Sequence, residues 1–221
     1  MPFLLLFLLG SSCGFTIPDS LIQKSETAFN RFNDSGQVTF VDILRDTSTV
    51  YYAATFKTLP FSYALARARF SQVDRSFSSF SYIKKFSKVE TQTSFCQYGT
   101  FLVVVGVLFA QSWFLCNLDS LESDSAGNFL LRINQNHEDS LNSRFRRQED
   151  GLFVVEYDHF TIWWRMKDLG NGKTRAGFIG CVAPSIWIPG WLYKIVSRFV
   201  FPSVLSSFEK SLQKAQQKQG K

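Results

Sequence analysis

The alternation of apolar and polar residues is clearest just after residue 159. Residues two apart share one face of a strand, and the pattern assigns Phe160, Ile162, Trp164 and Met166 to one face and Thr161, Trp163, Arg165 and Lys167 to the other. The apolar set is expected to face the concave side of a sheet. A turn signal at 170–173 and a second alternating run at 174–182 then predict a β-hairpin.

A long amphipathic helix is predicted from Pro189 to Gln213, after a Pro-rich corner. Its apolar positions recur at helical spacing. They are Leu192, Ile195, Val196, Phe199, Val200, Leu205, Phe208 and Leu212. Pro202 lacks an N–H and is expected to kink or restart the helix near Arg198. The Gln- and Lys-rich tail, residues 216–221, is expected to fray.

Several further elements are predicted upstream of this hairpin. A helical segment is expected within 17–36, and a second helix begins at Pro60, where a missing N–H costs nothing. Phe77, Phe80, Ile83 and Phe86 recur at spacings of three, which suggests short helical turns. Strands are expected over 38–44, 49–56, 128–134, 143–147 and 152–167.

The run from Phe101 to Leu118 contains no charged residue. Its length approaches the ~20 residues of a membrane-spanning helix. Polar Gln111, Ser112 and Asn117 interrupt it, and its valines favour strand. Two strands with a turn near 110–112 are therefore the preferred prediction, and a membrane helix is the alternative.

Composition and charge narrow the classes of function. The chain has 221 residues, 45% of them hydrophobic, with 24 Phe, which is enough for one large domain with a core and a pocket lining. The net charge of +6 is scattered, with small clusters at 144–147 and after Lys210. No recognition motif accompanies this charge, so nucleic-acid binding is not expected. An anionic membrane surface is the better-matched partner.

The N-terminus has the pattern of a targeting segment. An apolar run at 3–9 is followed by small residues, so residues 1–14 are expected to be a signal peptide, although a charged n-region is missing. Cys13 is a candidate for lipidation, but Gly10 stands where a lipobox has Leu. We therefore expect export, with the protein periplasmic, anchored in a membrane through Cys13, or secreted. The alternative is a buried N-terminal strand.

The remaining cysteines and the two histidines offer little catalytic or metal chemistry. Cys96, Cys116 and Cys181 form no C-x-x-C pair, so zinc is not expected, and no other cofactor is. Either two of them pair in an exported protein, or all three are small buried residues. His159 follows Asp158, but adjacent strand residues point to opposite faces and make poor catalytic partners.

Four segments carry a resemblance to a known superfamily: GLFVVEY at 151–157, TIWW at 161–164, GKTRA at 172–176 and IPGWL at 188–192. Together with the order of elements, they resemble the START-like (SRPBCC) superfamily of helix-grip domains, which includes START lipid-transfer domains, polyketide cyclases and coenzyme Q-binding proteins. The resemblance covers about residues 38–215. It implies an α+β fold in which a curved antiparallel sheet wraps around the C-terminal helix, in a domain spanning 37–215.

The same resemblance implies a deep apolar cavity, roofed by the last helix, that binds a lipid or another hydrophobic molecule. Many lipid-binding members carry an Arg and an acidic residue inside the cavity. The charged strand positions here are Arg132, Arg144, Arg146 and Glu156, and none of them matches that pair clearly. The polarity of the ligand therefore stays open.

Candidate lining residues come from the predicted apolar faces. They are Phe101, Val103, Val105, Phe109, Trp113, Glu156, Phe160, Ile162, Trp164, Met166, Phe178 and Phe199. Core and apolar pocket use the same residue types, so ordinary core is the alternative for each, and a surface carboxylate is the alternative for Glu156.

Two classes of function remain. The first is non-catalytic binding, with or without transfer, of a lipid or other hydrophobic ligand. The second is a cyclase- or hydratase-type enzyme that uses the same cavity. The first is preferred, because an enzyme of this fold needs polar residues converging in the cavity and the sequence offers few. Peripheral or lipid-anchored association with a membrane is compatible with either class.

Overall fold

The computed structural model describes residues 19–32, 37–45, 49–71, 83–89, 99–107, 110–121, 128–135, 153–154, 157–184 and 187–219. Within these ranges the helices are α1 (Asp19–Arg31), α2 (Tyr63–Ser71) and α5 (Gly190–Gln219). The strands are β1 (Gln37–Arg45), β2 (Thr49–Leu59), β3 (Ile83–Val89), β4 (Gly99–Val107), β5 (Ala110–Leu121), β6 (Asn128–Gln135), β7 (Phe153–Val154), β8 (Tyr157–Gly170) and β9 (Lys173–Pro184).

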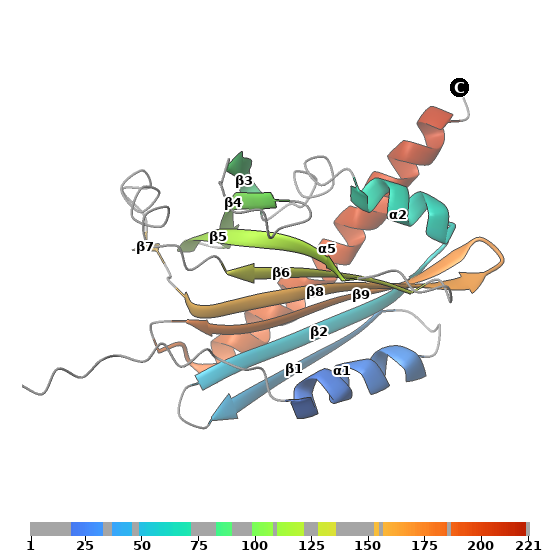
Figure 1. Cartoon of the computed structure of the whole chain (residues 1–221). Helices are drawn as coiled ribbons and strands as arrows, with labels where there is room; N and C mark the ends of the chain where they lie inside the picture. Colours follow the sequence, from blue (N-terminus) through green and yellow to red (C-terminus); the bar gives the residue numbers. More distant parts are fainter. Residues whose placement is uncertain are drawn as a thin grey trace, which may run out of the picture.

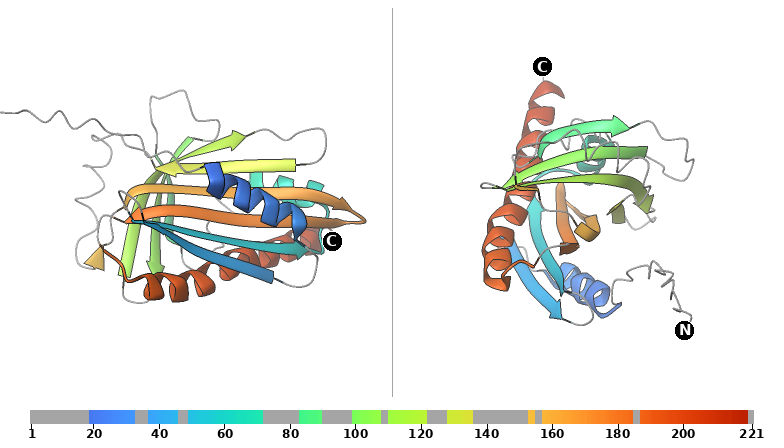
Figure 2. Two further views of the ribbon diagram at one scale, coloured as in Figure 1. Left: turned by 90° about the horizontal axis from the view of Figure 1, so that it is seen from below. Right: turned by 90° about the vertical axis from the view of Figure 1, so that its left-hand side faces the viewer.

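The described strands form one sheet, with a helix on each face. Along the sheet the order is β1-β2-β9-β8-β6-β5-β4-β3, all neighbours are antiparallel, and short β7 pairs parallel with β5. Helix α5 runs along one face and α1 lies on the other (Figure 1; Figure 2). The predicted α+β helix-grip fold is confirmed.

The hairpin of β8 and β9 is the longest pairing in the sheet. Trp164 lies opposite Phe178, and the register continues to Gly170 opposite Lys173. The turn needs left-handed backbone: φ is 72° at Gly170, 51° at Asn171 and 71° at Gly172. Glycine and asparagine adopt this region most easily, and the predicted turn is confirmed.

The uncharged run after residue 100 forms two strands, as preferred, but the turn expected near 110–112 is wrong, because these residues already belong to β5 and pair with β4. β4 and β5 pair antiparallel from Gly99 opposite Leu118 to Val107 opposite Ala110. In this arrangement the backbone polar groups of the run bond to neighbouring strands. The membrane-helix alternative for this run is wrong. More generally, none of the described helices has the length and apolar character needed to cross a membrane.

Two predictions of local structure differ from the fold. Ile83–Val89 is strand β3, paired with β4, so the expectation of helical turns there is wrong. Spacing of three suggested a helix, but pairing with an apolar neighbour decided the conformation. Phe77, Phe80 and the predicted strand at 143–147 lie outside the described residues, as do residues 1–18 with Cys13.

Helix α5 is longer than predicted. It passes through Pro202 without a break and continues to Gln219 rather than ending near Gln213. Gln37 Nε2, on β1, donates a 3.1 Å hydrogen bond to the carbonyl oxygen of Pro202. The final turns are rich in Gln, Lys and Ala, which are good helix formers even when exposed.

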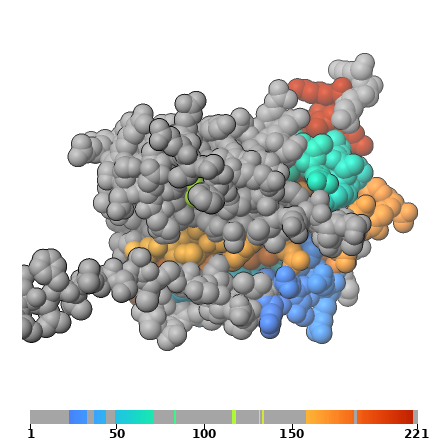
Figure 3. All heavy atoms as spheres, in the orientation of Figure 1, coloured from blue at the N-terminus to red at the C-terminus, as the bar shows by residue number. Residues whose placement is uncertain are grey.

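The outer face of the sheet carries its own hydrophobic core beneath α1. Phe29 of α1 and Phe32, which directly follows the helix, pack on Phe56, at ring-centroid distances of 5.7 and 6.2 Å. Tyr52, Ala54, Ile179 and Cys181 complete this cluster from the strands. Figure 3 shows this side of the molecule, with α1 in blue beside the strands in orange. Arg165 of β8 joins the two elements through an ion pair with Glu26 of α1.

Cys116 and Cys181 are buried thiols, as expected if these cysteines are small buried residues, and Cys96 lies outside the described residues. Burial raises the pKa of the Cys181 thiol to about 12. Burial also raises the pKa of Tyr52 to about 12, against the opposing effect of a hydrogen bond with Ser25. Both groups are therefore neutral in the folded protein at physiological pH.

These two groups predict a loss of stability in alkali. In the unfolded chain they release protons near 9.0 and 10.0, so rising pH favours unfolding once it exceeds the unfolded pKa values. We expect the urea midpoint to fall as the pH rises from about 9 towards about 12. A Cys181→Ala/Tyr52→Phe double variant should show a shallower decline. An identical decline in the variant would assign the effect to other groups.

Candidate functional site

The inner face of the sheet, which faces α5, brings together five of the twelve predicted lining residues. Phe160, Ile162, Trp164 and Met166 share this face of β8, and Phe178 joins them from β9. The alternation predicted for both strands is therefore confirmed, and these five candidates are brought together.

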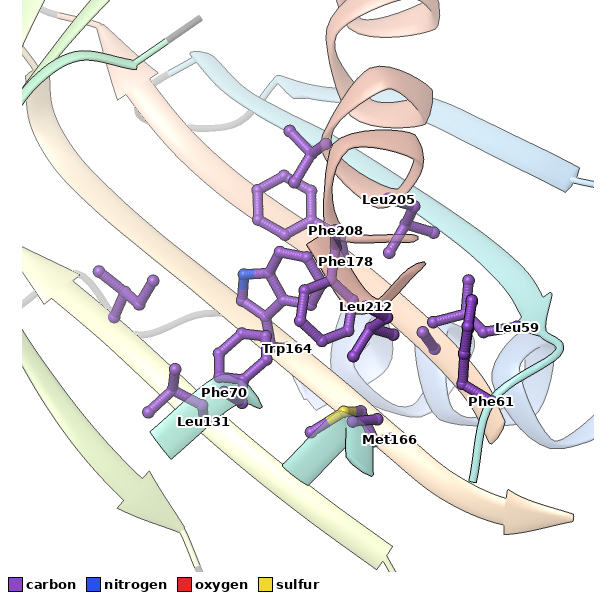
Figure 4. Close-up of a cluster of buried hydrophobic side chains, with 14 of the residues drawn as sticks. Leu59, Phe61, Phe70, Leu131, Trp164, Met166, Phe178, Leu205, Phe208 and Leu212 are labelled. Carbon is purple, nitrogen blue, oxygen red and sulfur yellow. The ribbon is translucent and has the colours of Figure 1, made fainter. Parts of the chain in front are cut away.

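Trp164 is the centre of an aromatic cluster and is fully buried. Its ring lies 4.8 Å from Phe70 of α2, 5.0 Å from Phe178 and 5.4 Å from Phe208 of α5, measured between centroids. Figure 4 shows the indole surrounded by these rings, with Met166 and Leu212 beyond it. Side chains fill this end of the inner face, so Trp164 is a core residue.

Helix α5 presents one stripe of residues to the sheet. The stripe comprises Tyr193, Ser197, Phe201, Val204, Leu205, Phe208, Ser211 and Leu212. Polar contacts fix it at several points along its length. Lys57 of β2 forms a 2.6 Å ion pair with Glu209, Arg69 Nε of α2 donates to Ser211 Oγ at 3.4 Å, and the Tyr51 hydroxyl donates to the carbonyl of Ile188.

Burial along the inner face is not uniform. Trp164 and Met166 are fully buried, whereas Ile162 and Val182 are only partly buried. Ile162 and Val182 nevertheless lie in interior strands, on the face that α5 crosses. Among the described residues of β8 and β9, the inner face is therefore closed around Met166 and less completely buried at Ile162 and Val182. We call the latter region the Ile162 end.

Gly180 brings α5 close to the sheet at the Ile162 end. It lies opposite Ile162 in the register. A Cβ added at Gly180 would come within 2.8 Å of Phe201 Cζ, so glycine permits the ring to rest on the strand. Phe201 also contacts Phe178, with ring centroids 5.0 Å apart.

Several of the described polar side chains on the inner face have hydrogen-bond or ion-pair partners. Thr55 lies within hydrogen-bond distance of Gln37 and Thr39, and Thr174 donates to the carbonyl of Phe61 at 2.8 Å. The ionic side chain Lys57 is paired with Glu209, as above. Ser197 of α5 adds a buried hydroxyl-bearing residue towards the Ile162 end.

His159 lies on the face of β8 opposite to the inner face. His159 Nε2 lies 3.0 Å from Thr161 Oγ1, so it is occupied on the side of β8 opposite to Phe160. Among the described residues, no group of three or more His, Cys, Asp or Glu side chains could hold a metal ion.

The other candidate lining residues are placed differently. Phe199 is 69% exposed and points away from the sheet, so its assignment to the lining is corrected: α5 has a second apolar face, and Phe199 lies on it. Phe101, Val103 and Val105 lie in β4 and Trp113 in β5, where the structure describes the backbone. Phe109 and Glu156 lie outside the described residues, as do Arg144 and Arg146.

Several residues of the inner face were not predicted as lining. Phe70, Phe201 and Phe208 all contact predicted residues directly. Phe208 was among the apolar positions of the predicted helix, so its helical spacing already indicated that it packs on the sheet. Gly180, at the centre of an apolar strand, was the available sign that a bulky residue such as Phe201 comes close.

Comparison with known proteins places this architecture. No family model and no curated protein matches the sequence. Among solved structures, human STARD10 is similar with a TM-score of 0.65 at 11% identity, over 93% of this chain and 84% of that one. Human StAR-related lipid transfer protein 5 gives 0.56 at 9%, over 90% of this chain and 100% of that one.

The Zhui aromatase/cyclase from Streptomyces sp. R1128 is similar as well, with a TM-score of 0.51 at 9% identity, over 78% of this chain and 96% of that one. START domains and this cyclase belong to one superfamily, START/SRPBCC. The chain has the START-like fold. The resemblance read from the sequence is confirmed, and at these identities the likeness concerns the fold of the START-like domain.

Proposed function

We propose that this START-like domain binds a lipid or another hydrophobic ligand at the Ile162 end, between the inner face of the sheet and the N-terminal half of α5. The observation that carries the proposal is the partial burial of Ile162 and Val182 on the face that the helix covers. Apolar side chains that the fold leaves incompletely covered favour an apolar occupant, by ~25 cal/mol for each Å² removed from water.

The chemistry of this region supports binding rather than catalysis. Ile162 is flanked in the register by Ile133 and Gly180, and Phe160, Phe178 and Phe201 lie close by. General acid–base catalysis needs a titratable group within hydrogen-bond reach of the substrate. The described side chains that flank Ile162 on the inner face supply none.

A cyclase-type reaction is the second candidate, because one structural neighbour is an aromatase/cyclase. Lipid transfer is favoured over it by the apolar lining, and another neighbour is named as a lipid transfer protein. Ser197, a buried residue of α5 one helical turn before Phe201, supplies the hydroxyl that we assign to a polar atom of the ligand. A ligand with one polar end and an apolar body fits this combination.

The test is a substitution that fills the Ile162 end. Ile162→Trp adds volume where the inner face is less completely buried, so the domain should stay folded while bound ligand is lost. Native mass spectrometry of the purified protein, followed by lipid extraction, should show occupancy reduced by about tenfold or more, because overpacking an occupied site costs ~1–3 kcal/mol.

Two further variants keep this test decisive. Gln213→Trp inserts the same side chain at an exposed position of α5 and should retain full occupancy. Val182→Leu is a milder way of filling the same region, should Ile162→Trp unfold the domain. Full ligand occupancy in a folded Ile162→Trp protein would place the ligand elsewhere. Conversion of an extracted compound by the wild type, but not by Ser197→Ala, would favour the enzyme instead.

A further inference from the structure

The first half of α5 has a second apolar face that the fold does not use. Trp191, Ile195 and Phe199 recur every four residues, and Trp187 precedes them just before the helix begins. Their exposed fractions are 65%, 48%, 69% and 78% respectively. We call these four residues the outer aromatic stripe.

The stripe faces away from the sheet because of helix geometry. Tyr193, Ser197 and Phe201 are the sheet-facing residues of the same turns, and Tyr193 packs on Tyr51 at a centroid distance of 4.5 Å. Each stripe residue in the helix stands two positions from a sheet-facing one, which is about 200° around the axis. Figure 2 shows α5 along the outside of the sheet, with one side open.

Such a stripe is not a by-product of packing. A surface helix of a globular protein normally places charged or polar residues opposite its buried face. Large apolar groups gathered on one exposed strip mark an interaction site. Tryptophan is enriched where water meets lipid, and Trp and Phe are typical of the apolar face of helices that lie in that layer.

The charges around the outer aromatic stripe indicate the chemistry of its partner. Lys194 and Arg198 lie exposed in the same helical turns, and the sequence from Trp187 to Phe208 contains no Asp or Glu. The pKa of Asp42 on β1 is lowered mainly by its hydrogen bond with Lys24, with which it forms a 2.5 Å ion pair, and to a smaller extent by the charge of Lys194. The surface is thus apolar with a basic border, which is complementary to an anionic lipid surface.

We propose that the outer aromatic stripe inserts into the interfacial layer of an anionic membrane, with Lys194 and Arg198 meeting lipid phosphates and carboxylates. This inference goes beyond ligand binding and stands on the exposed residues alone. It also places the Ile162 end close to the bilayer, since only the N-terminal half of α5 would lie between that region and the lipid.

The experiment is co-sedimentation of the full chain with vesicles of phosphatidylcholine alone or mixed with phosphatidylserine. We expect binding to the mixed vesicles, weakening with added salt. Trp191→Ser/Phe199→Ser should weaken this binding by about 100-fold, because two aromatic side chains that the membrane would bury are lost. Phe40→Ser removes an exposed aromatic of the opposite face and should leave vesicle binding unchanged.

The contribution of the basic residues to vesicle binding is tested with two matched double variants. Lys194→Glu/Arg198→Glu should weaken binding to the mixed vesicles by about tenfold or more. Lys214→Glu/Lys218→Glu makes the same change in net charge at exposed positions of the distal end of α5 and should have a smaller effect. Circular dichroism of each variant should match the wild type, so that a loss of binding is not a loss of fold.

Three results would overturn the proposal. The first is no binding of the wild type to the mixed vesicles. The second is equal binding of Trp191→Ser/Phe199→Ser, which would assign membrane attachment to another part of the chain. The third is a wild-type dimer that this variant dissociates, which would make the stripe an interface between two copies. Ligand occupancy in solution is measured separately, so failure here leaves the Ile162 end as a distinct question.

Discussion

Trp164→Ala should lower the free energy of unfolding by about 3–5 kcal/mol. The indole is fully buried and touches rings from α2, β9 and α5. Its removal leaves a cavity at the point where three elements meet, and aromatic neighbours on rigid strands and helices collapse poorly into such a space. Urea unfolding, followed by circular dichroism, measures the change.

Trp191→Ala is the matched control, since it truncates the same residue type where the side chain is mostly exposed. Its effect on the free energy of unfolding should stay within about 0.5 kcal/mol. Comparable losses for both variants would mean that the cluster around Trp164 is not the core of the domain.

Phe208→Ala should cost a similar ~3–5 kcal/mol, through the helix side of the same cluster. Phe208 is fully buried and contacts Phe70 at 5.2 Å and Trp164 at 5.4 Å between centroids. Because Phe208 and Trp164 touch, the two truncations should not be additive. A double-mutant cycle should give a coupling of about 0.5–1.5 kcal/mol.

Phe199→Ala provides the comparison within α5 itself. It removes the same side chain from the exposed face, so the free energy of unfolding should hardly change while vesicle binding falls.

Additive effects of Trp164→Ala and Phe208→Ala would show that α5 and the sheet are stabilised independently. That result would contradict the packing of the helix onto Trp164.

The sequence predicted best where two independent signals coincided. For β8 and β9, strict alternation of apolar residues met a turn containing glycine and asparagine, and both the strands and their inward faces were correct. For β4 and β5, alternation was absent, because an apolar run reads the same whether it forms a helix or strands. Only its valines and its interrupting polar residues favoured strands.

Errors arose where a periodic pattern had two physical meanings. The spacing of Ile83 and Phe86 imitated a helix, while pairing with β4 made the segment a strand. Phe199 shares helical spacing with true core residues, and sequence alone gives no indication of which of two apolar faces meets the sheet. The sheet decides this, through the close approach of Phe201 to Gly180 and of Tyr193 to Tyr51.

The presence of a core on each face of the same strands has a consequence for how this domain can evolve. In β9, Ile179 and Cys181 belong to the α1 side, while Phe178 and Gly180 belong to the side of α5. A substitution at one position therefore alters one side only. Residues at the Ile162 end can drift in size and polarity while the opposite face keeps the sheet intact, and if the proposed ligand binds there, its identity can change with them. A fold that is stabilised by a separate hydrophobic core on each face of its sheet can acquire new specificities by small steps. In this way one architecture comes to serve unrelated functions.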